Sequence, residues 1–264
     1  MDLMRARVTL RERPLLDVFD LAVRFCALNA GAYARLSLAV LLPAAAACWA
    51  AAHFGGWWLG WATAVVVSSF ATAPFVALAS RLVFADAVGT GEAIRMALRA
   101  LPRLMGIRLL QLLALLASSV LVWLPWLWIG SVLLFVVEVV ILEQAGVAAT
   151  FGRAQRIANA QFGTAASAMF IILLAPIGAA MLADVAGREI LQSVLEIKAP
   201  TSMFREGGSW LALVGWWSTL PILATARFFV YLDIRTRTEG WDIQTRFAAI
   251  ATRGAEESTR RQAA

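Results

Sequence analysis

Residues 109–124 read LLQLLALLASSVLVWL, and only one glutamine and two serines interrupt their apolar character. A transmembrane β-strand would instead alternate apolar and polar residues over about ten positions. Inside lipid the backbone must satisfy its own hydrogen bonds, so a long apolar run forms a helix. Five other segments also reach the roughly 20 apolar residues that cross a bilayer. The sequence therefore predicts an all-α membrane protein with six transmembrane helices, near residues 33–53, 58–82, 106–124, 127–146, 164–184 and 209–232.

The overall composition agrees with this fold class. Of the 264 residues, 61% are hydrophobic and 15% are charged, whereas soluble domains have about half and about a quarter. The net charge is +6, and 22 of the 23 cations are arginine. These arginines are scattered between the spans and form no basic stripe with aromatic residues, so we expect no nucleic-acid partner. We expect a single membrane domain over 1–253 and a disordered polar tail over 254–264.

Charge and tryptophan predict the same orientation in the membrane. Only Arg188, Lys198 and Arg205 lie on one side of the predicted spans, which leaves 23 − 3 = 20 cations in or beside 1–32, 83–105, 147–163 and 233–264. The cation-rich side is cytoplasmic by the positive-inside rule. Ten of the 11 tryptophans lie at or near the opposite face, where indole rings favour the headgroup boundary. Both termini are therefore expected in the cytoplasm, and loop 185–208, whose pattern over 185–197 suits an interfacial helix, outside.

An internal repeat is visible as the spacing Ala-x-Arg-x6-Gly, which occurs three times, each time before a pair of predicted spans. The three sets are Ala22, Arg24 and Gly31; Ala97, Arg99 and Gly106; and Ala154, Arg156 and Gly163. We expect three units, over about 14–84, 90–146 and 148–234, followed by a C-terminal interfacial helix. Each unit is an amphipathic cytoplasmic helix plus a helical hairpin. The amphipathic helices either lie on the bilayer, with arginines toward anionic lipid headgroups, or pack against the ends of the bundle.

Glu138 is the most notable ionisable residue inside a predicted span. Glu138 is in the run LLFVVEVVIL, and Glu143 follows five residues later. A charge at that depth is costly and marks a candidate functional site. Its expected partners are Arg108, Arg81 or Arg227. Glu138, Glu143, Arg108 and Arg227 are the candidates for binding a substrate or lipid, and a structural buried pair and proton or ion handling are the alternatives.

The sequence has little that suggests catalysis or metal binding. His53 is the only histidine, and Cys26 and Cys48 are far apart in the chain. Neither a zinc site nor a disulfide framework is expected from this set. The chain has no His-Glu-x-x-His, Gly-x-Ser-x-Gly or Walker motif. We expect no metal, no cofactor and no enzymatic activity.

The end of the last predicted span reads FFVYLDIRTRTEGWD from Phe228. It resembles the closing motif Tyr-x-Asp-x-Arg-x-Arg-x-Glu-Gly-x-Asp of a broad group of bacterial multipass proteins similar to the membrane domain of glycerophosphoryl diester phosphodiesterases. The layout of interfacial helices and the acid Glu143 also resemble that group. The matching motif residues are Tyr231, Asp233, Arg235, Arg237, Glu239, Gly240 and Asp242.

The resemblance implies a location in the bacterial inner membrane but no phosphodiesterase activity. In that family a separate soluble barrel domain carries the catalysis, and these 264 residues contain no counterpart to it. Some members without the barrel accompany MoxR-type ATPase gene clusters, which implies assembly of membrane complexes. We therefore expect a non-catalytic subunit or scaffold that binds membrane or cytoplasmic proteins through its cytoplasmic helices. The alternative is a transporter or lipid-binding protein that uses Glu138, which a cavity in the middle of the membrane would favour.

Overall fold

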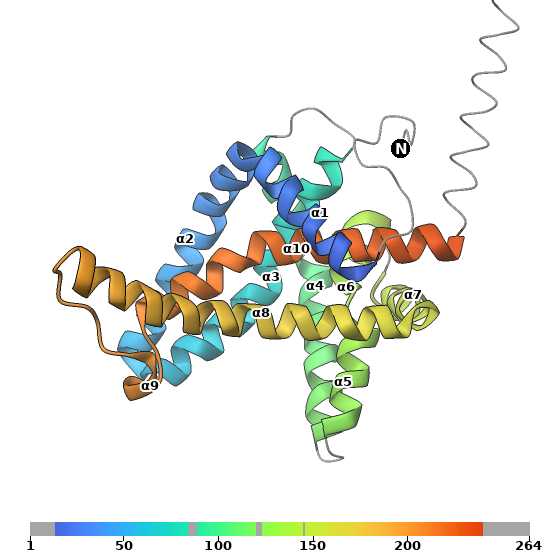
Figure 1. The fold of residues 1–264 in the computed structure, drawn as a ribbon. Coiled ribbons are helices and arrows are strands. Elements are labelled where there is room, and N and C mark those ends of the chain that lie inside the picture. The colour runs from blue at the N-terminus through green and yellow to red at the C-terminus, as the bar shows by residue number, and fades with distance from the viewer. Residues whose placement is uncertain (1–13, 84–88, 120–122, 145, 240–264) are drawn as a thin grey trace, which may run out of the picture.

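The computed structural model describes residues 14–83, 89–119, 123–144 and 146–239, and every regular element in these ranges is a helix (Figure 1). This confirms the all-α class. Gly240, Asp242, the predicted C-terminal interfacial helix and the predicted tail 254–264 lie outside the described residues. The elements are α1 (Leu15–Leu28), α2 (Ala30–Gly55), α3 (Trp57–Leu82), α4 (Thr90–Ser119), α5 (Trp123–Val132), α6 (Val136–Glu138), a π-helical turn (Val139–Glu143), α7 (Val147–Ala160), α8 (Phe162–Glu189), a second π-helical turn (Ile190–Val194), α9 (Met203–Glu206) and α10 (Trp210–Glu239).

Within the described residues, four helices are long and apolar enough to cross a membrane: α2, α3, α8 with the π-turn that follows it, and most of α10. They coincide with the first, second, fifth and sixth predicted spans. The helix from Phe162 to Val194 has 33 residues, which at 1.5 Å per residue is about 50 Å. The hydrocarbon core is about 30 Å thick. This helix is longer than the core is thick, and it includes the first ten residues of the segment 185–197. That segment therefore begins as a continuation of α8, whereas the sequence suggested a separate interfacial helix.

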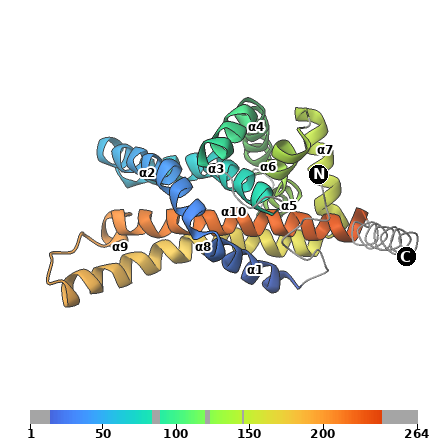
Figure 2. The same ribbon diagram turned by 90° about the horizontal axis from the view of Figure 1, so that it is seen from above.

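The middle of the chain differs most from the prediction. The amphipathic helix and the span expected near 90–105 and 106–124 form one continuous helix, α4. The span expected over 127–146 is divided into α5, α6 and a π-turn by a turn at 133–135. The hairpin of α4 and α5 stands across α8 and α10 instead of running alongside them (Figures 1 and 2). A bundle of six spans therefore stays a prediction.

Helices α8 and α10 lie side by side along most of their length (Figures 1 and 2). A Cβ atom added at Gly215 of α10 would lie 2.6 Å from the Cβ of Ala183 and would also collide with the backbone of Ala179. Small residues of this kind let helix backbones approach in lipid, where packing holds helices together. At the end of α2, Gly56 takes a φ of +82°, which glycine adopts freely. This lets α2 turn directly into α3.

The first and third amphipathic helices, α1 and α7, each have 14 residues. Each ends three residues before its repeat glycine, and the break before the next helix falls at Asn29 and at Gln161. The equivalent residue of the middle unit is Leu104, which is 1% exposed and lies inside α4. Leucine is a strong helix former and is buried here, so this unit continues without a break.

The three segments that carry the predicted repeat spacing bury the same positions relative to its glycine. The repeat arginines Arg24, Arg99 and Arg156 are exposed in every unit. Helix α1 packs across α10, where the rings of Phe25 and Phe229 are 5.2 Å apart. Of the two placements that the sequence left open, packing against the bundle accounts for this buried face. The buried positions are Val18, Ala22 and Phe25; Ala93, Ala97 and Ala100; and Thr150, Ala154 and Ile157.

Candidate functional site

Glu138 is completely buried, and Arg227 of α10 is its partner. The Arg227 Nε donates to Glu138 Oε1 at 2.6 Å, and the two side chains are 7% and 0% exposed. Arg227 is one of the three partners expected from the sequence. Arg81 instead lies 3.6 Å from the surface residue Glu92. Each of the two buried charges needs the other, because a buried charge without its partner would strongly destabilise the folded protein.

The π-turn Val139–Glu143 explains why Glu138 and Glu143 both face α10. In an α-helix, side chains five residues apart point about 140° away from each other. A π-turn closes between residues five apart, so it returns the chain to the same side. On α10 the opposing residues Arg227, Tyr231 and Arg235 are four apart and share one face of a regular helix.

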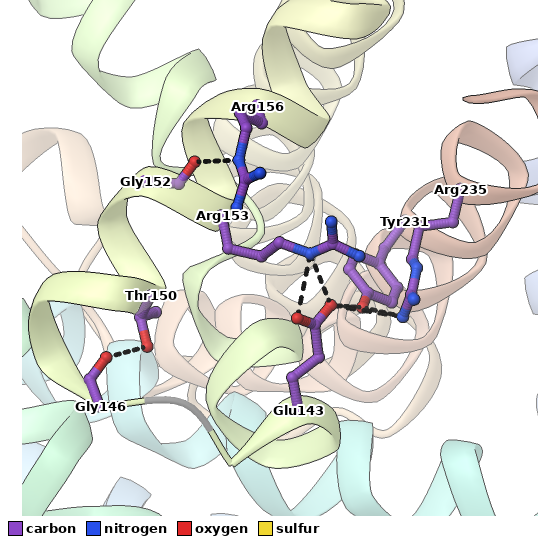
Figure 3. Close-up of polar contacts among 8 residues, drawn as sticks. All are labelled: Glu143, Gly146, Thr150, Gly152, Arg153, Arg156, Tyr231 and Arg235. Atoms are coloured by element: carbon purple, nitrogen blue, oxygen red, sulfur yellow. Dashed lines mark hydrogen bonds and ion pairs between the residues drawn. The ribbon is translucent and has the colours of Figure 1, made fainter. Parts of the chain in front are cut away.

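Glu143 is the centre of a second polar cluster (Figure 3). The Nε of Arg153, from α7, lies 3.2 and 3.0 Å from its two carboxylate oxygens. The Tyr231 hydroxyl donates to Oε1 at 2.8 Å, and the Arg235 Nη1 is 3.3 Å from the same oxygen. Arg235 also donates to the Tyr231 hydroxyl at 2.8 Å. We call these four residues the Glu143 cluster, and it joins α7 to α10 beside the π-turn.

Several other predicted site residues lie outside these two groups. Asp233 and Arg237 form an i, i+4 ion pair at 3.0 Å on α10, as the sequence spacing suggested. Arg24 pairs with Asp20 on α1, and Arg156 donates to the carbonyl oxygen of Gly152 on α7. Glu239 ends α10. The C-terminal motif is thus divided between the Glu143 cluster and a local pair.

A cavity of about 330 Å³ lies between α3, α4, α5, α8 and α10. Arg108 and Arg227 line it, so it borders the buried Glu138–Arg227 pair. Its remaining wall is mainly apolar, with a few hydroxyl and amide groups. The lining residues from α3, α8 and α10 belong to the middle turns of these long helices. They are Val65, Ser68, Ser69, Thr72, Met169, Ile172, Leu173, Pro176, Trp216, Thr219, Leu220, Leu223, Ala224 and Arg227.

Several buried polar atoms at this site have no hydrogen-bond partner among the described residues. They are Arg108 Nε, Arg227 Nη2, Trp216 Nε1 and Glu138 Oε2. Arg108 does make other contacts: its Nη1 donates to Gln111 Oε1 at 2.6 Å and its Nη2 to the Ser69 carbonyl at 3.4 Å. Buried polar atoms are nearly always paired, so an unpaired group calls for a specific explanation.

Asp184 is a buried acid that the sequence analysis did not single out. It lies in α8 with 0% exposure. The hydroxyls of Ser202 and Ser209 and the backbone N–H of Met203 all donate to its carboxylate. It therefore holds the loop between α8 and α10 at the predicted outer side. The available signal was its position as the only acid in the predicted span 164–184.

Both cysteines are free thiols. Cys26 of α1 lies 3.6 Å from the Thr225 hydroxyl, which also lies 2.7 Å from the hydroxyl of Tyr33. Burial raises the pKa of the Cys26 thiol, and the hydrogen bond to Thr225 opposes that change. Within the described ranges, no three His, Cys, Asp or Glu side chains are grouped so that they could hold a metal ion.

In comparisons with family models, with curated proteins and with solved structures, nothing matches this chain. The resemblance of its C-terminal motif therefore stays an expectation from the sequence. What the structure shows, within the residues it describes, is an all-helical protein with four helices long and apolar enough to cross a membrane.

Proposed function

We propose that this is a non-catalytic multipass protein of the bacterial inner membrane that binds an amphiphilic small molecule in the cavity between α3, α4, α5, α8 and α10. The observation that carries the proposal is the cavity itself, with two arginines on an otherwise mainly apolar wall. Its volume of about 330 Å³ falls within the range of about 300–1,000 Å³ typical of ligand pockets. A filled bundle core would have favoured a purely structural role.

The rim of the cavity supports entry from the bilayer. Val65 and Leu173 line the cavity and are 56% and 44% exposed. On helices that can span a membrane, such exposed apolar side chains face lipid tails. A molecule with a polar head and an apolar tail can therefore enter sideways without leaving the bilayer.

The test uses two neighbouring positions on α10. Thr219 lines the cavity, whereas Ser218 is exposed and does not line it. Thr219→Phe should fill the cavity and reduce co-purified lipid at least tenfold, as measured by native mass spectrometry in mild detergent. Ser218→Phe should retain the wild-type amount. Equal retention by both folded variants would contradict the proposal.

A scaffold that binds membrane or cytoplasmic proteins is the second candidate. The Glu143 cluster supports it, because this cluster fixes α7 to α10 and so gives the predicted cytoplasmic side a rigid surface. Arg24, Arg99 and Arg156 are exposed on that side. Reversing these three charges to Glu should release bound proteins and leave lipid in the cavity if the scaffold role holds. Loss of lipid from this variant, with the bound proteins retained, would contradict the scaffold role.

The full topology is also part of the proposal: six spans, in three repeats, with cytoplasmic termini. The matching ends of α1 and α7 and the matching buried positions of all three units support the repeat. An even number of crossings, four or six, is consistent with both ends of the chain on one side. With Cys26 and Cys48 replaced, single cysteines at Ser202 and Ser258 should react with an impermeant reagent from opposite sides. Reaction of both from the outside would refute the topology.

A further inference from the structure

We infer that the cavity takes the anionic headgroup of an amphiphile, a phosphate or a carboxylate on an apolar tail, and that Arg108 is the residue that holds this anion. The inference rests on the proposed binding function and adds the chemical class of the ligand. It follows from the charges, the unpaired donors and the wall of the cavity.

The cavity has more positive than negative charge around it. Arg227 is neutralised by Glu138 at 2.6 Å. Arg108 contacts neutral groups, the Gln111 side chain at 2.6 Å and the Ser69 carbonyl at 3.4 Å. A guanidinium in the middle of a membrane needs a counter-charge, and an anionic ligand supplies it.

The unpaired hydrogen-bonding atoms of the cavity wall are donors. Arg108 Nε, Arg227 Nη2 and Trp216 Nε1 all belong to lining residues. The hydroxyls of Ser68 and Ser69 already donate to carbonyl oxygens of α3. A ligand that fits this wall must bring acceptors, and phosphate and carboxylate oxygens are the acceptors that guanidinium groups bind best.

The rest of the wall matches an alkyl tail. It is formed mainly by large apolar side chains, and a tail placed there keeps its contact with other hydrocarbon. The rim residues that face lipid let a long chain extend into the bilayer. The apolar wall includes Leu133, Leu134, Ile172, Leu173, Leu220 and Leu223.

The experiment compares headgroups on the purified full-length protein in mild detergent. Binding of phosphatidylglycerol and of phosphatidylcholine with identical acyl chains is measured by native mass spectrometry. The wild type should bind the anionic lipid at least tenfold more tightly. Arg108→Gln should abolish that preference and still bind phosphatidylcholine, Arg108→Lys should keep most of it, and Arg99→Gln, which removes an exposed arginine from the same helix, should keep all of it.

Each other outcome has a definite meaning. Equal binding of the two lipids, lost in Thr219→Phe, overturns the anion site and leaves the proposed cavity function intact. Binding of neither lipid overturns both. A preference unchanged in Arg108→Gln, with only a lower melting temperature, means that Arg108 has a structural role alone and overturns the inference. Oleate binding as tightly as phosphatidylglycerol identifies any anionic amphiphile as the ligand, and displacement by inorganic phosphate at similar concentration identifies a free anion and overturns the amphiphile.

Discussion

Glu138 ends α6 and Glu143 ends the π-turn that follows it; both meet the same face of α10, but their surroundings differ. Glu138 is completely buried, has one arginine partner, and keeps one oxygen unpaired beside a cavity. Glu143 is 22% exposed and is surrounded by two arginines and a tyrosine. Glu138 thus belongs to a single ion pair, whereas Glu143 belongs to a hydrogen-bonded network.

The difference follows from what burial requires. A buried ion pair must compensate the lost hydration of both charges, and further hydrogen bonds normally do this. The Glu143 cluster has those bonds, whereas the Glu138–Arg227 pair lacks some of them. The cluster is therefore complete in the protein alone. The pair leaves Glu138 Oε2 and Arg227 Nη2 without a hydrogen-bond partner among the described residues, and Arg227 also lines the cavity in which we propose that a ligand binds.

The largest expected effect is that of Glu138→Leu. The substitution leaves Arg227 buried without a counter-charge, which costs about 3–5 kcal/mol in comparable cases. Thermal unfolding of the purified protein in detergent should show this loss. Glu138→Gln keeps an acceptor at the same place and should lose less.

The double variant Glu138→Leu with Arg227→Met provides the matched control. It removes both charges and fills their volume with apolar groups, so most of the lost stability should return. An unchanged melting temperature in Glu138→Leu alone would contradict a structural pair and would make Glu138 itself a functional group.

The second effect concerns the network. Glu143→Ala removes the acceptor shared by Arg153, Tyr231 and Arg235 and should cost about 1.5–3 kcal/mol, the range for hydrogen bonds to charged groups. The loss is smaller than for Glu138→Leu because water reaches the partners. Arg153→Gln should cost part of this amount, and Arg156→Gln, on the same helix with only a local carbonyl contact, should cost almost nothing. Equal losses in the two α7 variants would show that the cluster does not fix α7.

Much of the fold follows from local patterns in the sequence. Four of the predicted spans match helices α2, α3, α8 and α10 within a few residues, apart from the extended ends of α8 and α10. The repeat spacing predicts a helix before each pair of spans, and α1 and α7 are separate helices at the first and third of these places. Hydrophobicity and short-range spacing determine these features, so the sequence alone suffices for them.

Features that depend on distant contacts could not be predicted. The partner of Glu138 is 89 residues away in the chain, and the spacing left three arginines equally possible. A π-turn differs from an α-turn by a single residue, and no pattern around Glu143 marks it. Helix α4 packs against α3 and helix α5 against α8, and these contacts between distant segments orient the α4–α5 hairpin. The hydrogen bonds of Asp184 could not be predicted either, because their donors lie in the loop 202–209, whose position depends on the tertiary fold.

The smallest expected effect is a difference in salt dependence between the two acidic sites. In a double-mutant cycle, Glu143 and Arg153, which are 22% and 26% exposed, should couple by about 0.5–1 kcal/mol at 50 mM salt, near the upper range for exposed pairs. At 1 M salt the screening length falls to about 3 Å, so this coupling should fall by at least half. The coupling of Glu138 and Arg227 should stay constant, because salt ions do not reach a pair that is 0% and 7% exposed. If both couplings fell together, ions would be reaching the buried pair through the cavity, and the cavity would be an aqueous path rather than a site for an amphiphile.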